Sequence, residues 1–325
     1  MADTRLTIAT VPYDRIEALR YGAIRPEGIV LDYQTVIPAH DIFYAMVERE
    51  AWDVSEMSLA YSLMRFARGD APFVGIPVFP SRVFRHGNIF VNRRAGIARP
   101  KDLEGRRVGI QEFRQTAAIW VRGMLRDDHG VNTEAISWVE GGVNEPKRNS
   151  STDMRPGPAY KVEPLAAGRS LSDALAAGEL DAVIAATTPE SLHTSDDVVR
   201  LFPDFRAMEQ DYFRRTGIFP IMHTLVIRRP LFQANPWMAG SLFRAFEASK
   251  AVAAKRMRYT GAMVYMTPWL QADVEEMDAV FRGDAWPYGL DANRAQLDTF
   301  LRYLVEEGFL DRAPRLDDLF APVTG

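Results

Sequence analysis

The chain has 325 residues, of which 47% are hydrophobic and 25% are charged, and its formal net charge is −4. This is the composition of an ordinary globular protein, and it supplies no broad attraction for nucleic acid or for an anionic membrane surface. The chain has no cysteine, which excludes disulfides, thiolate metal sites and cysteine nucleophiles. We therefore expect a small-molecule partner, with no nucleic acid and no membrane.

Strand-like and helical stretches alternate from the N-terminus. Strands are expected at residues 6–11, 29–36 and 54–57, and helices at 15–21, 41–50 and 59–68. This alternation is typical of a mainly parallel sheet covered by helices. The N-terminus shows neither a basic nor an apolar targeting stretch, so a cytoplasmic protein is expected.

A second α/β unit follows a β-rich stretch at residues 73–92. Its expected strands are 107–111, 136–140 and 181–186, its helices are 115–127 and 170–177, and the Pro-rich stretch 144–168 predicts a long surface loop. One hydrophobic core rarely serves more than about 250 to 300 residues, so two lobes are expected. The prediction is lobe 1 from residues 1–95 plus 206–325, with residues 96–205 inserted as lobe 2.

Several motifs carry a family resemblance. Lys101–Gly109 and Ser170–Ala182 resemble type II periplasmic solute-binding proteins. A narrower resemblance, to the 4,5-dihydroxyphthalate decarboxylase family, rests on Gln115–Leu125, Trp138–Gly142, Phe219–Thr224 and Trp286–Leu290. It implies two α/β lobes with mixed sheets around a central cleft, and conversion of 4,5-dihydroxyphthalate to protocatechuate. An ABC-type solute-binding protein for a small aromatic or carboxylate ligand is the alternative.

Decarboxylation of a hydroxylated ring requires a proton donor, a base near the phenol and cations for the carboxylates. The densest candidate cluster lies at residues 81–88, where Arg82 and Arg85 are expected to bind carboxylates and His86 to donate the proton. If this stretch is extended, Arg82 and His86 share one face and Arg85 points away. The alternative is that these are surface arginines beside a hydrogen-bonded histidine.

His223 and Glu112 are further catalytic candidates. His223 lies on a predicted strand, where a lone histidine is more often part of the core than a proton donor. Glu112 is placed to act as a base toward the phenol, and it is equally suited to cap its helix or to pair with Arg114 at the surface. Which residue acts as acid and which as base stays open.

Strand ends and helix starts supply the other candidates, since ligands commonly bind there. The remaining expected substrate-binding residues are Tyr13, Glu56, Ser58, Gln111, Thr116, Ala117 and Gly142. Ser58 is equally suited to cap the helix that follows it. No phosphate loop, dinucleotide fingerprint or zinc spacing is present, so no cofactor is expected. A divalent metal and a homo-oligomer are left open.

Overall fold

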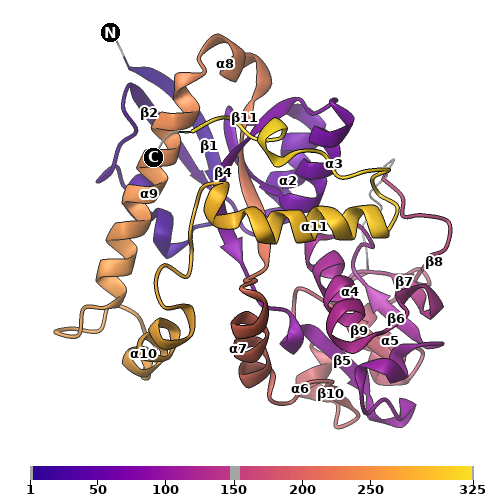
Figure 1. The fold of residues 1–325 in the computed structure, drawn as a ribbon. Coiled ribbons are helices and arrows are strands. Elements are labelled where there is room, and N and C mark those ends of the chain that lie inside the picture. Colours follow the sequence, from indigo (N-terminus) through magenta and orange to yellow (C-terminus); the bar gives the residue numbers. More distant parts are fainter. Residues whose placement is uncertain (1–2, 147–153, 324–325) are drawn as a thin grey trace. The chain divides into compact units, whose positions relative to one another are not determined.

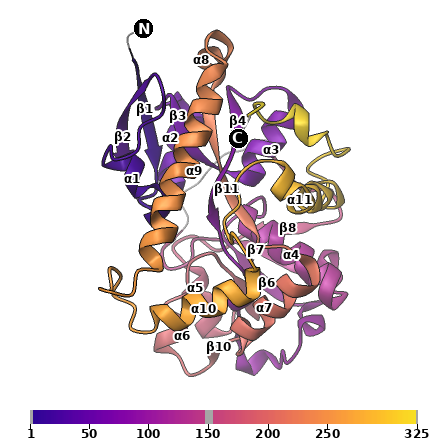
Figure 2. The ribbon, with the colours of Figure 1, turned by 60° about the vertical axis from the view of Figure 1, so that its left-hand side comes forward.

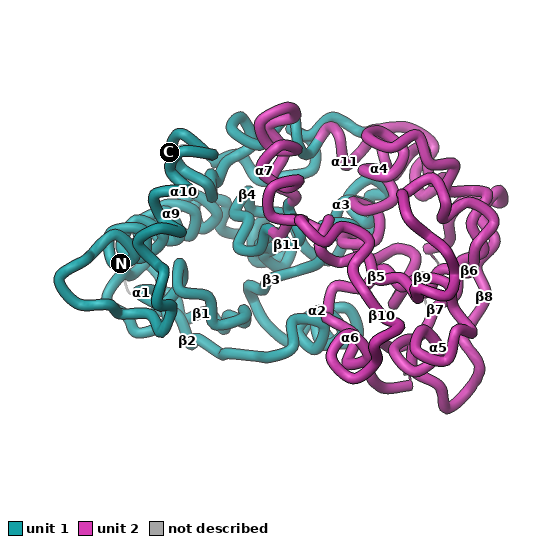
Figure 3. Tube along the Cα trace, turned by 90° about the horizontal axis from the view of Figure 1, so that it is seen from below, with its two compact units in different colours: residues 1–82, 221–297, 314–325 teal, residues 83–220, 298–313 magenta. Residues whose placement is uncertain are grey.

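The computed structural model describes residues 3–146 and 154–323 and divides into two compact units. Unit 1 comprises residues 1–82, 221–297 and 314–325, and unit 2 comprises residues 83–220 and 298–313 (Figure 3). The boundaries expected from the sequence, 95/96 and 205/206, fall inside unit 2. The reason lies at residues 89–92, which form a strand of the second sheet and not of the first.

Unit 1 is built on a five-stranded mixed sheet in the order β2-β1-β3-β11-β4 (Figure 1). Its strands are β1 (Thr4–Thr10), β2 (Ile29–Thr35), β3 (Val54–Ser58), β4 (Phe73–Arg82) and β11 (Ile221–Arg228). β1 is parallel to β2 and β3, whereas β11 is antiparallel to both β3 and β4. The carboxyl ends of β1 and β3 therefore meet the amino end of β11 at one edge of the sheet.

The helices that lie wholly in unit 1 are α1 (Glu17–Arg20), α2 (Ala39–Arg49), α3 (Leu59–Arg68), α8 (Arg229–Ala234), α9 (Trp237–Met257) and α10 (Leu270–Phe281). Of these, α2, α3 and α9 bury several apolar side chains each. The boundaries of α3 match the sequence prediction, because Ser58 caps its start by accepting from the Tyr61 N–H and Gly69 ends it in a left-handed conformation. The capping role expected for Ser58 is confirmed.

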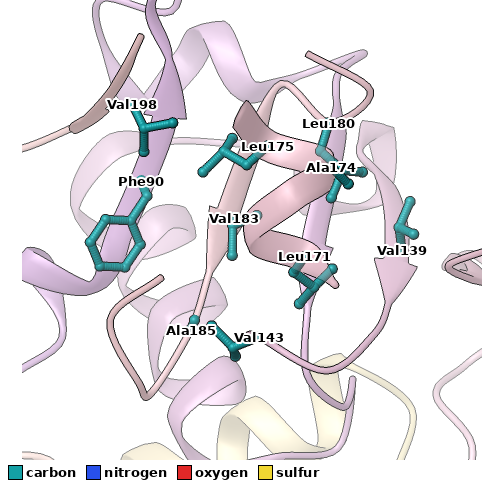
Figure 4. Packing of buried hydrophobic residues seen from close by; sticks show 10 residues of the cluster. All are labelled: Phe90, Val139, Val143, Leu171, Ala174, Leu175, Leu180, Val183, Ala185 and Val198. Carbon is teal, nitrogen blue, oxygen red and sulfur yellow. The ribbon is translucent and has the colours of Figure 1, made fainter. Parts of the chain in front are cut away.

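Unit 2 contains a six-stranded mixed sheet in the order β10-β5-β9-β6-β7-β8. Its strands are β5 (Ile89–Asn92), β6 (Arg107–Ile110), β7 (Ser137–Glu140), β8 (Lys161–Pro164), β9 (Ala182–Ile184) and β10 (Val198–Arg200). Its helices are α4 (Thr116–His129), α5 (Leu171–Ala177), α6 (Ser191–Thr194), α7 (Phe205–Thr216) and most of α11 (Arg294–Glu306). Leu171, Ala174 and Leu175 of α5 pack on Val183 and Phe90 (Figure 4).

One buried ion pair stands out in unit 2. Arg122 of α4 donates through Nε to Glu307 Oε1 over 3.0 Å, and both side chains have no exposed surface. Arg126, one turn further along α4, donates to the same Glu307 oxygen over 3.0 Å. A buried charge without a partner is costly, so α4 and the residue that follows α11 are tied together.

Two details differ from the sequence-based expectations, and two helices were not predicted. The first sheet is mixed, as the family resemblance implies, and not mainly parallel as the alternation of strands and helices alone indicates, because β11 runs against its neighbours. The predicted loop at 144–168 contains β8, which pairs with β7, and its residues 147–153 lie outside the described residues. Helices α7 and α10 give no clear apolar periodicity in the sequence, since α7 buries only Tyr212 and α10 buries only Val274 and Val280.

Among the described residues, no helix is both long and apolar enough to span a bilayer.

Candidate active site

Glu56 of β3 lies at the centre of a polar group in unit 1. Its carboxylate is fully buried and accepts three hydrogen bonds. Oε1 lies 2.5 Å from His223 Nδ1 and accepts from the Tyr13 hydroxyl over 2.6 Å, and Oε2 accepts from the Val11 N–H over 3.0 Å. Two side chains and one backbone group therefore converge on one buried carboxylate.

The sheet topology explains this convergence. Tyr13 follows the carboxyl end of β1, Glu56 lies near the carboxyl end of β3, and His223 lies near the amino end of β11. His223 is in register with Ser58 on one side and with Ser81 of β4 on the other. Parallel strands bring their carboxyl ends to the same edge, which is where ligands commonly bind in α/β sheets.

Hydrogen bonds determine the protonation state of the Glu56 carboxyl group. Burial favours the protonated form of Glu56, but the hydrogen bonds from His223, Tyr13 and the Val11 N–H outweigh it and lower the pKa of this carboxyl. Burial, and then the neighbouring Glu56 carboxylate, raise the pKa of the Tyr13 hydroxyl, so it stays neutral and donates. An ionised Glu56 can only accept, so His223 carries a proton on Nδ1.

His223 is a partly accessible member of this group. Its side chain is 18% exposed, whereas that of Glu56 is 0% exposed. Phe43 of α2 packs edge-on against the imidazole, with ring centroids 4.9 Å apart. With Nδ1 fixed on the carboxylate and one face held by Phe43, Nε2 is the ring nitrogen that remains for proton transfer.

Arg15 supplies a cation beside this group, and sequence reasoning missed it. Its guanidinium lies 4.0 Å from the centroid of the Tyr13 ring and 5.2 Å from that of Trp286. Its Nε donates to the Pro80 carbonyl over 2.5 Å, and Nη1 pairs with Asp14 over 3.1 Å. One feature of the sequence could have indicated this role: Arg15 lies two residues after Tyr13, shortly after the end of the first strand.

Arg82 is held by structural contacts in unit 1. Its guanidinium donates to Gln296 Oε1 over 3.0 Å and to the Pro287 carbonyl over 2.7 Å, and also to Asn293 Oδ1. Burial lowers its pKa to about 9. These contacts tie the end of β4 to the first turn of α11 and to the segment before it, and they do not favour a role in substrate binding.

Arg85 and His86 belong to unit 2. The condition under which Arg82 and His86 would share one face, an extended stretch, is not met, because β4 ends at Arg82 and a 3₁₀ turn occupies His86–Asn88. His86 is 3% exposed, packs against Tyr212, and has its Nδ1 3.9 Å from Glu209 Oε1. Burial lowers its pKa to about 4, so it is neutral at pH 7 and poorly suited to donate a proton. Arg85 donates to the Ala186 carbonyl over 3.4 Å.

The other unit 2 candidates cluster at the carboxyl ends of β6 and β7. Gln111 follows β6 and Gly142 follows β7, and these strands are parallel neighbours. Thr116 and Ala117 open α4 and are buried. Glu112 Oε2 pairs with Arg114 Nη2 over 3.0 Å, which is the structural role foreseen for it, although the pair is largely buried and not at the surface.

Comparison with known proteins assigns the family. The chain is 34% identical to a curated 4,5-dihydroxyphthalate decarboxylase of Comamonas testosteroni over 325 residues, which cover 100% of this chain and 98% of that one. The chain belongs to the 4,5-dihydroxyphthalate decarboxylase family. A curated member of the same name from Pseudomonas putida is 34% identical over 215 residues, covering 66% of this chain and 83% of its own. No family model matches the chain.

Solved structures show the fold of this family member. The periplasmic sulfonate-binding protein SsuA of Methylobacillus flagellatus matches with a TM-score of 0.53 at 13% identity, covering 99% of this chain and 93% of that one. A ligand-binding component of an ABC-type import system from Staphylococcus aureus matches with a TM-score of 0.50 at 10% identity, covering 99% and 97%. The fold is therefore that of type II periplasmic binding proteins, with two mixed α/β sheets.

The side chains of this decarboxylase-family chain can hold and transfer a proton. Within residues 3–146 and 154–323, no group of three or more His, Asp or Glu side chains is arranged to bind a metal ion. The Glu56 carboxylate can stabilise a protonated His223, and Tyr13 fixes the orientation of that carboxylate. This is the arrangement of a general acid supported by a buried counter-ion.

Proposed function

We propose that the chain is a carboxy-lyase that converts 4,5-dihydroxyphthalate to protocatechuate, with His223 as the proton donor. The observation that carries the proposal is the 2.5 Å contact between His223 Nδ1 and the buried Glu56 carboxylate at the strand-end edge of unit 1. The 34% identity to a curated decarboxylase over the whole chain supports the reaction class. The sheet-edge position supports the location of the site.

The proposed reaction is balanced in atoms and charge. A proton passes from His223 Nε2 to the ring carbon that carries a carboxylate, assisted by electron donation from the hydroxyl para to it. The bond from this carbon to the carboxylate then breaks, its electron pair returns to the ring, and CO2 leaves. Solvent reprotonates His223, so that one proton is consumed for each CO2 released. Glu56 stabilises the imidazolium before the transfer.

Arg15 is the group that we assign to a substrate carboxylate. Its guanidinium lies over the ring of Tyr13 and over that of Trp286, and its side chain is 16% exposed. A guanidinium that is fixed before binding loses little conformational freedom when it grips a carboxylate. When Arg15 binds the carboxylate that stays in the product, the carboxylate that leaves as CO2 is oriented toward His223.

Product analysis in deuterated water tests the proposal directly. Purified protein is incubated with 4,5-dihydroxyphthalate, CO2 is trapped, and the aromatic product is examined by proton NMR. We expect protocatechuate with one deuterium at the carbon that lost CO2, and product formation slower by about 100-fold or more in the His223→Gln variant. Failure of the wild-type protein to release CO2 would contradict the assigned substrate.

Binding without turnover is the second candidate function, favoured by the likeness to the solute-binding fold. In that case calorimetry with 4,5-dihydroxyphthalate or a related aromatic acid would show binding, while the CO2 trap stays empty. Replacement of His223 would then change the affinity for the aromatic acid, and neither the variant nor the wild-type protein would release CO2. The same two measurements on one protein sample separate the two functions.

A further inference from the structure

The stretch Trp286–Leu290 carries part of the family resemblance, but the proposed function uses only its first side chain. This stretch follows α10 and belongs to unit 1. Cζ of Arg15 lies 5.2 Å from the centroid of the Trp286 ring. A guanidinium is attracted to the face of an aromatic ring, and a ring that is fixed in place also restricts the cation. The contacts that hold Trp286 therefore bear on the position of Arg15.

Lys250 of α9 holds the backbone of Trp286. Lys250 is only 8% exposed, and its Nζ donates to the Trp286 carbonyl over 2.9 Å. The same nitrogen donates to Asp284 Oδ2 over 2.6 Å and to Glu247 Oε1 over 3.1 Å. An ammonium group has three N–H donors, and these three bonds use them. Lys250 therefore has no donor left for a substrate, and two carboxylates balance its charge.

The N–H of Trp286 depends on the same ion pair. It donates to Asp284 Oδ1 over 2.8 Å, while Oδ2 of that carboxylate accepts from Lys250. Both the N–H and the carbonyl of Trp286 are thus bonded to the Lys250–Asp284 pair. The end of the stretch is attached elsewhere, because the Gly289 N–H donates to the Pro77 carbonyl of β4 over 2.7 Å. Loss of Lys250 would therefore release Trp286 while Gly289 stays bonded to β4.

Helix α9 also contacts the segment that follows Arg15. Figure 2 shows α9 beside α1, with the chain turning back beyond the carboxyl end of α9 into α10. Ser249, the neighbour of Lys250 in α9, is fully buried, and its Oγ accepts from the Leu19 N–H of α1 over 3.4 Å. Two successive residues of one helix therefore bond to the segment after Arg15 and to Trp286.

We propose that Lys250 is a positioning residue for substrate binding, which fixes Trp286 against Arg15 and so holds this guanidinium in the orientation that binds a carboxylate. The proposal rests on the proposed function, because it uses the assignment of Arg15 to a substrate carboxylate. Lys250 acts through geometry and not through its charge, which Asp284 and Glu247 balance at close range. Its effect on substrate affinity must therefore depend on the presence of Arg15.

A double-mutant cycle tests this dependence. The parent protein is the His223→Gln variant, in which turnover is slow enough for calorimetry to measure the dissociation constant for 4,5-dihydroxyphthalate. We expect Lys250→Met to raise this constant by about 5-fold or more, and Arg15→Ala to raise it by about 10-fold or more. The protein with both changes should bind as Arg15→Ala does, because Lys250 acts through Arg15. A general weakening of the structure would instead add to the effect of Arg15→Ala.

Three further variants support the cycle. Lys255→Met changes an exposed lysine of the same helix and should leave the dissociation constant unchanged. Lys250→Arg keeps a charge with N–H donors and should recover part of the affinity. Trp286→Leu removes the ring contact itself and takes the place of Lys250→Met in the cycle if urea unfolding shows that Lys250→Met does not fold.

The outcomes separate this proposal from the proposed function. An unchanged dissociation constant, or a loss that adds to that of Arg15→Ala, would overturn the positioning role even if the wild-type protein releases CO2. Coupled losses of affinity without CO2 release from the wild-type protein would contradict the proposed function and support the positioning role. A parent protein that does not bind 4,5-dihydroxyphthalate would overturn both.

Discussion

His223 and Glu56 lie on neighbouring strands, 167 positions apart in the chain, with 2.5 Å between imidazole Nδ1 and carboxylate Oε1. They meet because β11 returns to unit 1 and inserts between β3 and β4. The contact couples a fully buried carboxylate to a partly exposed ring. Proton transfer at this ring is the step on which the proposed reaction depends.

Replacement of His223 by Gln should reduce kcat by about 100-fold or more, because the proton donor is lost while an amide can still bond to Glu56. The KM for 4,5-dihydroxyphthalate should change by only a few-fold. Steady-state kinetics of His193→Gln, which alters an exposed histidine of α6, provides the control. Comparable kcat values for the His223 variant and the wild-type protein would remove His223 from the mechanism.

Glu56→Gln should lower kcat by about 10-fold to 100-fold, because the imidazolium of His223 loses its counter-ion. Steady-state kinetics at a fixed pH measures the effect. A kcat equal to that of the wild-type protein would contradict the supporting role of Glu56.

Arg15→Ala should raise KM by about 10-fold or more with a smaller change in kcat, because it removes a charged hydrogen-bond donor to the substrate carboxylate. Arg15→Lys should recover part of the affinity, since the charge stays and the planar fork is lost. Arg5→Ala, at an exposed position of β1, is the matched control. An unaltered KM in the Ala variant would rule out the assigned carboxylate contact.

His86 should make folding sensitive to mild acid. Burial lowers its pKa to about 4 from 6.5, with smaller effects from Asp128, His129 and Arg215. The unfolded chain therefore takes up a proton first, so stability is full above pH 6.5 and falls as pH decreases toward 4. The loss is at most about 3 kcal/mol. Urea unfolding at pH 7.5, 6 and 5 should show this decline, reduced in His86→Gln.

Much of the candidate site could be predicted from strand ends. Tyr13, Glu56 and Ser58 were each expected near a ligand because they end strands that precede helices, and the structure gathers them around one edge of the sheet. His223 was also a candidate. That it pairs with Glu56 could not be predicted, because the register of β11 depends on packing between segments far apart in sequence.

The cluster at residues 81–88 shows why the density of charges along a sequence can mislead. Arg82 and His86 are four residues apart, yet they belong to different units, and each is buried among groups of its own unit. The partners of Arg82 lie more than 200 positions away, as the separation of 214 from Gln296 shows. Nothing local in the sequence indicates such partners. Arg15 was missed for the opposite reason, because in the sequence it lies outside any cluster of basic residues.

The residues from Asn293 to Glu307 satisfy a buried guanidinium in each unit, that of Arg82 in unit 1 and that of Arg122 in unit 2. During synthesis neither arginine has these partners until the last part of the chain emerges. One segment of 15 residues thus supplies hydrogen-bond partners to a buried guanidinium in both units. A chain that lacked this segment would leave both guanidiniums without these partners, and a buried charge that loses a partner is destabilising.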